Sequence, residues 1–191
     1  PEHVRSVQVE GIRRVKLIDA TPIGINVRST VATYANVHDE LRKIYARHPE
    51  AKALGYKAGD FSYNTGRLRC PLCDGTGSIS LDVQFLPDVE IPCPECRGSR
   101  YGRDAGRVRV KTRSGAAFTL PELMAMDIHT ALDACTDWNV VRQRLQVLRD
   151  LGLGYLTLGE ATPTLSGGEA QRLKLASEMG RGQEDTVFVF D

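Results

Sequence analysis

Two pairs of cysteines constrain the fold of this 191-residue chain more than any other feature. Cys70 and Cys73 form one C-x-x-C pair, Cys93 and Cys96 form another, and 19 residues separate the pairs. This spacing supplies four thiolates, a common ligand set of tetrahedral zinc. A closed four-sulfur site leaves no open position for water, so we expect a structural ion. The alternative is four reduced, buried thiols without metal.

The stretch between the pairs predicts a β-hairpin. Residues 78–91 alternate apolar and polar side chains through Ile79, Leu81, Val83 and Phe85. So short a hairpin does not fold alone, so we expect the ion to hold it. The fifth cysteine, Cys135, lies on an apolar helical face and is predicted to be a buried, inert thiol. The four histidines are scattered and are expected not to be ligands.

Composition excludes some classes of protein. The 41% of hydrophobic residues suffices for a core. Five cysteines, four of them in metal-type pairs, fit a cytoplasmic metal protein better than a disulfide framework. The sequence has no signal-peptide pattern and no apolar run near the roughly 18–20 residues of a membrane span. We therefore expect no membrane partner.

A basic tract follows the second cysteine pair. A strand is predicted over residues 107–112, and Arg107, Arg109 and Lys111 would share one face of it. Arginine binds phosphate through two parallel hydrogen bonds, so the tract is a candidate for sequence-neutral contact with double-stranded DNA. The alternative is a solvated surface strand. The candidate DNA-binding residues are Arg97, Arg100, Arg103, Arg107, Arg109, Lys111 and Arg113.

A second motif lies near the C-terminus, at residues 165–176. Ser166, Gly167, Gly168 and Glu169 open a run of strong helix formers, so backbone N–H groups at the helix start are available to a phosphate. Ser166 and Glu169 also form a capping box, so a plain capped helix is the alternative. Capping alone does not call for two glycines, which weaken the first turn. The block resembles the signature motif of ABC-type ATPases.

Together these motifs resemble the UvrA family, the damage-recognition ATPases of bacterial nucleotide excision repair. The resemblance covers most of the chain. The matching part of the family's proteins is the zinc module and signature region of their second ATPase half. Besides the cysteine pairs, it rests on Phe85 to Val89, Pro92, Gly98, Arg100, Tyr101 and residues 151–159 and 164–179. Upstream it rests on residues 21–24, 28–29 and 32–34.

The resemblance implies ATP and Mg²⁺ as ligands of a longer protein that acts as a homodimer. It also implies double-stranded DNA and a UvrB-like helicase subunit of the excinuclease as partners, in the SOS response to DNA damage. Nucleotide would be bound in trans by Leu165, Ser166, Gly167, Gly168 and Glu169. Asp191 would be the Walker B-like aspartate.

Three departures from the family pattern shape what we expect of the chain itself. No G-x-x-x-x-G-K-[ST] loop occurs, so the isolated chain is predicted to be inactive as an ATPase. The sequence stops at Asp191, before the acid that would follow, so we expect a piece of a longer protein. Ala20 stands where the family commonly has Gln. This last departure raises the alternative of a UvrA-like paralogue linked to drug resistance.

A different class of protein shares one motif. Residues 70–77 fit C-x-x-C-x-G-x-G and so resemble the zinc-binding repeat of DnaJ-type chaperones. Residues 93–100 are a partial second copy of the same repeat. No J-domain pattern accompanies them. A zinc-binding chaperone-type interaction module is therefore kept as an alternative.

The predicted fold is α+β. Strands, or a hairpin turning near Gly11, are expected within residues 7–18. Helices are expected over 34–47, 120–126, 128–135 and 139–151, and a strand over 187–190. The expected division is an edge of the ATP-binding core (1–30), a first helical signature part (31–69), the zinc module (70–98), a basic strand with further helices (99–160), and the signature helix with a Walker B-like strand (161–191).

Overall fold

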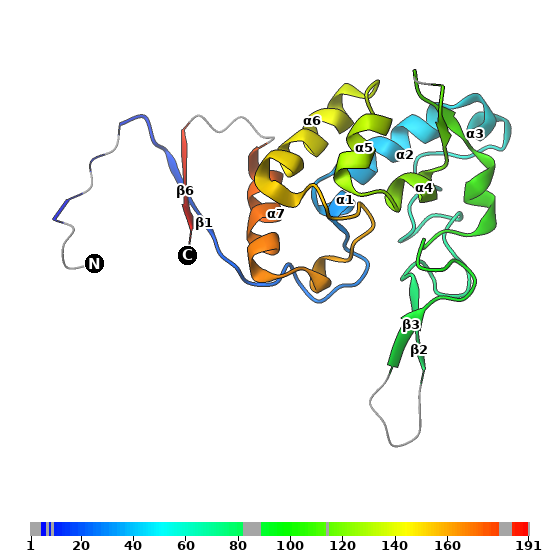
Figure 1. The fold of residues 1–191 in the computed structure, drawn as a ribbon, viewed down its shortest axis with the longest axis horizontal. Helices are drawn as coiled ribbons and strands as arrows, with labels where there is room; N and C mark the ends of the chain where they lie inside the picture. The colour runs from blue at the N-terminus through cyan, green and yellow to red at the C-terminus, as the bar shows by residue number, and fades with distance from the viewer. Residues whose placement is uncertain are drawn as a thin grey trace.

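The computed structural model describes residues 5–6, 8, 10–81, 89–113, 115–179 and 185–190. A helical body carries two extensions, a parallel strand pair and an antiparallel hairpin that project from different sides (Figure 1). The predicted α+β class is confirmed. No described helix has the length and apolar character needed to cross a membrane.

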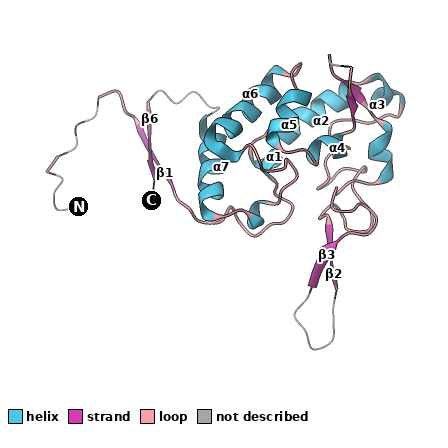
Figure 2. Ribbon diagram, in the orientation of Figure 1, coloured by secondary structure: helices cyan, strands magenta, loops and turns pink. Residues whose placement is uncertain are grey.

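The body consists of short helices around one core (Figure 2). In α2, Val37, Leu41 and Tyr45 recur four residues apart and are fully buried, because this spacing places them on one helix face. They pack with Leu123, Leu145 and other apolar residues from the remaining helices. The helices are α1 (Val31–Tyr34), α2 (Val37–Arg47), α3 (Pro49–Ala53), α4 (Leu120–Met124), α5 (Ile128–Ala134), α6 (Asn139–Leu148) and α7 (Gly167–Met179).

Local sequence signals explain where several helices begin. Thr119 caps α4 in a capping box with Glu122, and Pro121 lies in the first turn, where its missing N–H costs nothing. The carboxylate of Asp127 accepts a hydrogen bond from Thr130 N at 2.9 Å and caps α5. Short 3-10 helices, η1 (Arg103–Arg107) and η3 (Thr162–Thr164), and a π-helical turn, η2 (Arg149–Leu153), complete the body.

The strands in the described residues form three two-stranded sheets. β1 (Arg14–Ile18) pairs in parallel with β6 (Thr186–Phe190), with Leu17 opposite Val189. β2 (Ser78–Leu81) pairs antiparallel with β3 (Val89–Pro92), which confirms the hairpin predicted between the cysteine pairs. β4 (Val110–Lys111) pairs antiparallel with β5 (Ala117–Phe118). Val83 and Phe85 lie outside the described residues.

The structure corrects three expectations about the elements. The possible hairpin near Gly11 is wrong for the described residues, since the partner of β1 is β6. The helix expected over 34–47 is divided, because Asn36 adopts a left-handed conformation (φ 57°) between α1 and α2. The helix expected over 139–151 ends as α6 at Leu148 and continues as η2, where Gly152 has φ 73°.

The strand predicted over 107–112 is also largely wrong. Only Val110 and Lys111 form a strand, and Arg107 belongs to η1, so Arg107, Arg109 and Lys111 do not share one strand face. The cause is burial: the 3-10 turn places Ala105 in the core, and Val108 is buried just after it.

The cysteine-bearing segment lies close against the body at Gly75. Gly75 has φ 80°, and a Cβ built on it would lie 1.8 Å from the carbonyl oxygen of Tyr63. Gly98 has a similar φ of 88°, but a Cβ there would meet nothing within 4 Å. Both positions therefore require a left-handed backbone, but only Gly75 is also excluded by close contact.

These two glycines make a matched pair of variants. Gly98→Ala should lose about 1–2 kcal/mol of unfolding free energy from the left-handed conformation. Gly75→Ala should lose a further 1–3 kcal/mol, roughly, because the methyl group displaces the Tyr63 backbone. Urea unfolding of both variants, monitored by circular dichroism, measures the difference. Equal losses would contradict the close approach.

Candidate functional site

Four buried thiols converge on one point. The Sγ atoms of Cys70, Cys73, Cys93 and Cys96 all lie within 4.8 Å of one another. Cys70 and Cys93 are 3.8 Å apart, and Cys73 and Cys96 are 3.7 Å apart. A tetrahedral ion with metal–sulfur bonds of about 2.3 Å requires sulfur atoms about 3.8 Å apart. The four cysteines are therefore placed to hold a metal ion.

The two C-x-x-C segments face each other with matching backbone bonds. Cys93 N donates to the carbonyl of Gly77 at 2.9 Å, and Cys70 N donates to the carbonyl of Arg100 at 2.9 Å. Each segment turns through left-handed residues: Asp74, Gly75 and Gly77 in the first, and Arg97, Gly98 and Arg100 in the second. These two hydrogen bonds between the loops fix their relative orientation, and so the sulfur atoms converge.

The thiols differ in acidity. Burial raises the pKa of Cys70 and raises that of Cys96 to about 12. Burial also acts to raise the pKa of Cys73, but hydrogen bonds, first from Gly77 N at 3.3 Å and then from Cys96, lower it to about 7. Buried thiolates are costly without a compensating positive charge, which a bound cation would supply.

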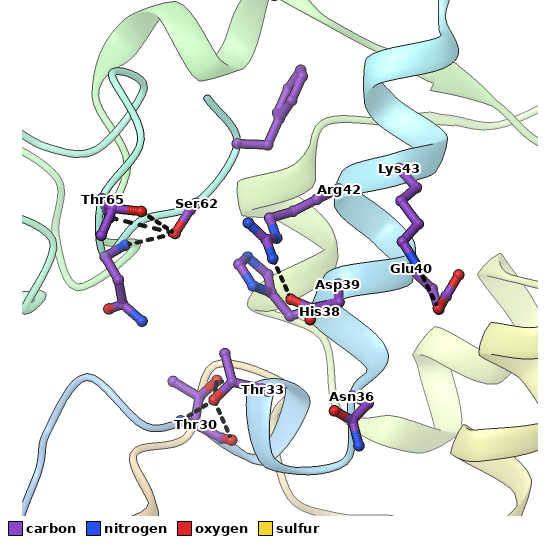
Figure 3. A network of polar contacts seen from close by, with 12 residues as sticks. Thr30, Thr33, Asn36, His38, Asp39, Glu40, Arg42, Lys43, Ser62 and Thr65 are labelled. Carbon is purple, nitrogen blue, oxygen red and sulfur yellow. Dashed lines mark hydrogen bonds and ion pairs between the residues drawn. The ribbon is translucent and has the colours of Figure 1, made fainter. Parts of the chain in front are cut away.

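Cys135 and the described histidines stand apart from this cluster. Cys135 is fully buried, as predicted, and burial raises its pKa to about 12, so it stays a protonated thiol. His38 is buried on α2, and desolvation lowers its pKa to about 3. Its Nε2 lies 2.7 Å from the hydroxyl of Tyr101. Figure 3 shows His38 beside Arg42 and above the Thr30–Thr33 pair at the start of α1. Sequence reasoning did not identify this buried polar contact, because a lone histidine carries no pattern.

The signature-like motif forms the start of α7. Ser166 Oγ accepts from Glu169 N at 3.4 Å, and Glu169 Oε2 accepts from Ser166 N at 2.7 Å, so the capping box is present. Ser166, Gly167 and Gly168 are exposed. Within the described part of the chain, neither Gly167 nor Gly168 donates a backbone hydrogen bond. Two N–H groups at a positive helix end are thus open to an external acceptor.

The loop before the motif supports this helix start. The hydroxyl of Tyr155 donates to Glu169, and this bond, with that from Ser166 N, lowers the pKa of Glu169. The guanidinium of Arg172 donates to the carbonyls of Leu151 and Gly152, both at 3.2 Å. Leu165 packs against the core. The motif is therefore held from both sides while its glycines stay exposed.

Ala20 lies beside the motif. A Cβ on Gly167 would be 3.2 Å from the Ala20 carbonyl oxygen. Lys174 of α7 pairs with Asp19 and donates to Thr21 O at 2.8 Å, and the bond from Lys174 lowers the pKa of Asp19 to about 2. Residues 19–21 are thus bonded to α7.

The basic tract is only partly a free positive surface. Arg100 is buried, at 7% exposure, so it cannot serve as a surface contact for DNA. The other six candidates are exposed. Four of them pair with acids: Arg103 with Glu95, Arg107 with Asp104, Arg109 with Glu122, and Arg113 with Asp137. Arg97 and Lys111 form no ion pair with any described residue. Asp191 lies outside the described residues.

Comparison with known proteins finds relatives of one kind, named UvrABC system protein A. The chain is homologous to one segment of UvrABC system protein A. It is 41% identical to that protein of Thermus thermophilus over 184 residues, which are 96% of this chain and 19% of the relative. It is 42% identical to the Micrococcus luteus protein over 193 aligned residues, which cover 100% of this chain and 19% of the relative. The chain thus spans about a fifth of these relatives' length.

A solved structure agrees with the sequence relatives. The crystal structure of UvrA2 from Deinococcus radiodurans matches with a TM-score of 0.82 at 41% identity, and the match covers 93% of this chain and 21% of that one. No protein-family model matches the chain.

The sulfur geometry predicts one zinc ion per chain. Metal analysis of the purified chain should give about one zinc, and Cys93→Ala should reduce it below half, because three remaining thiolates leave the tetrahedron incomplete. Cys135→Ala is the control and should retain the full content. Two ions or none in the unmodified chain, or full content in Cys93→Ala, would contradict the four-thiolate site.

Proposed function

We propose that this chain is the signature segment of a UvrA-type ABC ATPase that acts in DNA damage recognition during nucleotide excision repair. One observation carries the proposal: the exposed Ser166-Gly167-Gly168 start of α7, with two N–H groups open, in a chain about 40% identical to UvrABC system protein A. The longer protein is proposed to work as a cytoplasmic homodimer with a UvrB-like helicase subunit of the excinuclease.

The motif would act on a nucleotide held elsewhere in that protein. Ser166, Gly167 and Gly168 would present donors to the γ-phosphate of ATP bound with Mg²⁺ at a P-loop outside this chain. The helix dipole favours the negative charge, and capping by Glu169 keeps the first turn formed before nucleotide arrives. Leu165 would anchor the motif through its core contact. Asp191, directly after β6, is proposed as the Walker B-like ligand of Mg²⁺ through water.

The cysteine module would be a structural zinc centre beside a DNA-contacting surface. The exposed cations would bind phosphates without reading bases, which is a sequence-neutral contact. Arg97 and Lys111 are the best placed, since each is exposed and forms no ion pair with a described acid. Arg103, Arg107, Arg109 and Arg113 would first have to exchange a surface carboxylate for a phosphate.

The two alternative functions are not favoured. A chaperone-type module would share only the cysteine repeat, whereas the relatives match over nearly the whole chain. Nothing in the structure or in the comparisons favours a role in drug resistance; Ala20 fits beside Gly167 and leaves residues 19–21 bonded to α7.

DNA binding should depend on the unpaired cations. Arg97→Ala with Lys111→Ala should weaken binding to duplex DNA of any sequence. It should also lower the slope of log affinity against log salt by about 0.9 per lost phosphate contact. Fluorescence anisotropy at several salt concentrations measures both. The control is Arg142→Ala, an exposed arginine on α6. Equal effects from the control, or binding without salt dependence, would contradict the proposed surface.

ATP turnover should require the signature glycines but not occur in this chain alone. The 191-residue chain should show no ATP hydrolysis, since it has no P-loop. In the longer protein, Gly168→Asp should lower turnover at least about a hundredfold, because its carboxylate opposes the γ-phosphate. A Cβ at Gly168 meets nothing within 4 Å, so the fold tolerates the change.

Gly106→Asp, at another glycine with open space around it, is the control for that experiment and should keep turnover. Hydrolysis by a clean preparation of the short chain, or normal turnover in Gly168→Asp, would overturn the proposed role of the motif.

A further inference from the structure

Residues 27–32 run between the cysteine module and the loop that leads into the signature motif. On the module side, Arg100 Nη1 donates to the carbonyl of Val27 at 2.9 Å. Arg28, which belongs to the segment, donates to Asp74 in the first C-x-x-C loop. Its Nη1 donates to the Asp74 carbonyl at 2.6 Å and its Nη2 to the Asp74 carboxylate at 2.9 Å. Both C-x-x-C loops are therefore bonded to this segment, one through Asp74 and the other through Arg100.

The same segment is bonded to the signature side. Thr162 N donates to the carbonyl of Ser29 at 2.9 Å. Val31 N donates to Glu160 O at 2.9 Å, and Ala32 N donates to Leu158 O at 3.0 Å. η3 begins at Thr162 and is followed directly by Leu165 and Ser166. Four residues thus separate Thr162, which is bonded to the segment, from Gly167 of the motif.

Tyr63 joins the two sets of bonds in the interior. Its hydroxyl donates to Arg28 O at 3.2 Å and lies 2.9 Å from Thr30 Oγ1. The guanidinium of Arg100 lies over its ring, 5.3 Å from the centroid. Thr30 is fully buried and starts α1 through its capping box with Thr33, as Figure 3 shows. Burial and bonding on both sides leave the segment little freedom to move separately.

The backbone at Arg100 adopts a conformation that favours glycine. The equivalent position in the first C-x-x-C loop is Gly77, with φ 83°, and Arg100 adopts φ 71°. A left-handed conformation favours glycine, so an arginine here is unfavourable unless its side chain contributes elsewhere. The Arg100 guanidinium lies over the ring of Tyr63 and donates to the carbonyl of Val27 at 2.9 Å and to that of Gly75, in the first C-x-x-C loop, at 3.4 Å.

We propose that Arg28 and Arg100 are positioning residues that couple the cysteine module to the signature motif through residues 27–32. The coupling itself stands on these contacts, and its use rests on the proposed function: closure of the motif on nucleotide would reorient the module and the cations beside it. Coupling between two sites is reciprocal, so disturbing either side changes the other.

Hydrogen exchange on the zinc-loaded chain tests the coupling. Arg28→Gln removes the ion pair with Asp74, and Arg100→Gly removes the side chain while suiting the left-handed backbone. In both variants the peptide covering residues 158–166, on the far side of the segment, should exchange about tenfold faster. Peptides from α6 should be unchanged, and zinc content should stay at one per chain.

The matched control is Arg67→Gln. Arg67 also forms a surface ion pair with an aspartate, Asp60, at 3.2 Å, and lies over the ring of Tyr56, but it does not contact residues 27–32. Its exchange pattern over 158–166 should equal that of the unmodified chain. If Arg100→Gly loses zinc, the exchange rate over residues 158–166 in Arg28→Gln alone decides whether the coupling exists.

The reciprocal experiment starts from the signature side. Thr162 is buried and its hydroxyl donates to Ile23 O at 3.3 Å. Thr162→Pro removes both this bond and the N–H that donates to Ser29 O, and the extended backbone of Ala161 (ψ 133°) suits a following proline. It should speed zinc transfer to a colorimetric chelator several-fold, although Thr162 does not contact the cysteine loops. Unchanged exchange over 158–166 in zinc-loaded Arg28→Gln, or an unchanged chelation rate in Thr162→Pro, would overturn the coupling. Neither result would affect the DNA and ATP predictions, so failure of the coupling is distinguishable from failure of the proposed function.

Discussion

The convergence of four thiols on one point is the constraint on which the rest of the cysteine module depends. Among the described residues, only Ile79 packs against the four cysteines, so the described part of the module has almost no hydrophobic core of its own. A hairpin of two four-residue strands is marginal without such support. Its shape therefore comes from the facing backbone bonds, Cys93 to Gly77 and Cys70 to Arg100, and a cation held by the four thiols would add charge balance.

The start of α7 shows that two interpretations of one motif can both hold. The capping box of Ser166 and Glu169 satisfies the Glu169 N–H and stabilises the first turn, yet it uses neither glycine N–H. A helix end that is already capped needs no ligand to stay formed, so its remaining donors are preorganised for an anion. The capped-helix alternative thus describes how the motif is built and does not compete with a role in nucleotide binding.

Residue patterns predicted what depends on neighbours in the sequence. The cysteine spacing gave the metal-type cluster, four-residue periodicity gave the buried face of α2, and the Ser166–Glu169 pair gave the start of α7. The patterns failed where distant residues decide: Arg100 belongs to a basic run that indicates a surface, but Val27 and Tyr63 enclose it. Likewise the partner of β1 is β6, at the other end of the chain, and no local pattern near Gly11 encodes that pairing.

Surface charge pairing sets how the basic tract can act. Exposed ion pairs such as Arg109–Glu122 contribute about 0–1 kcal/mol, so exchanging the carboxylate for a phosphate costs little. Each exchange still leaves a free carboxylate near the DNA, which repels the backbone and reduces the net gain. In the proposed complex with DNA, the paired arginines would therefore add orientation more than affinity, and the binding energy would fall chiefly to Arg97 and Lys111. Because Arg97 lies in the second C-x-x-C loop, any movement of the cysteine module moves one of these two cations directly.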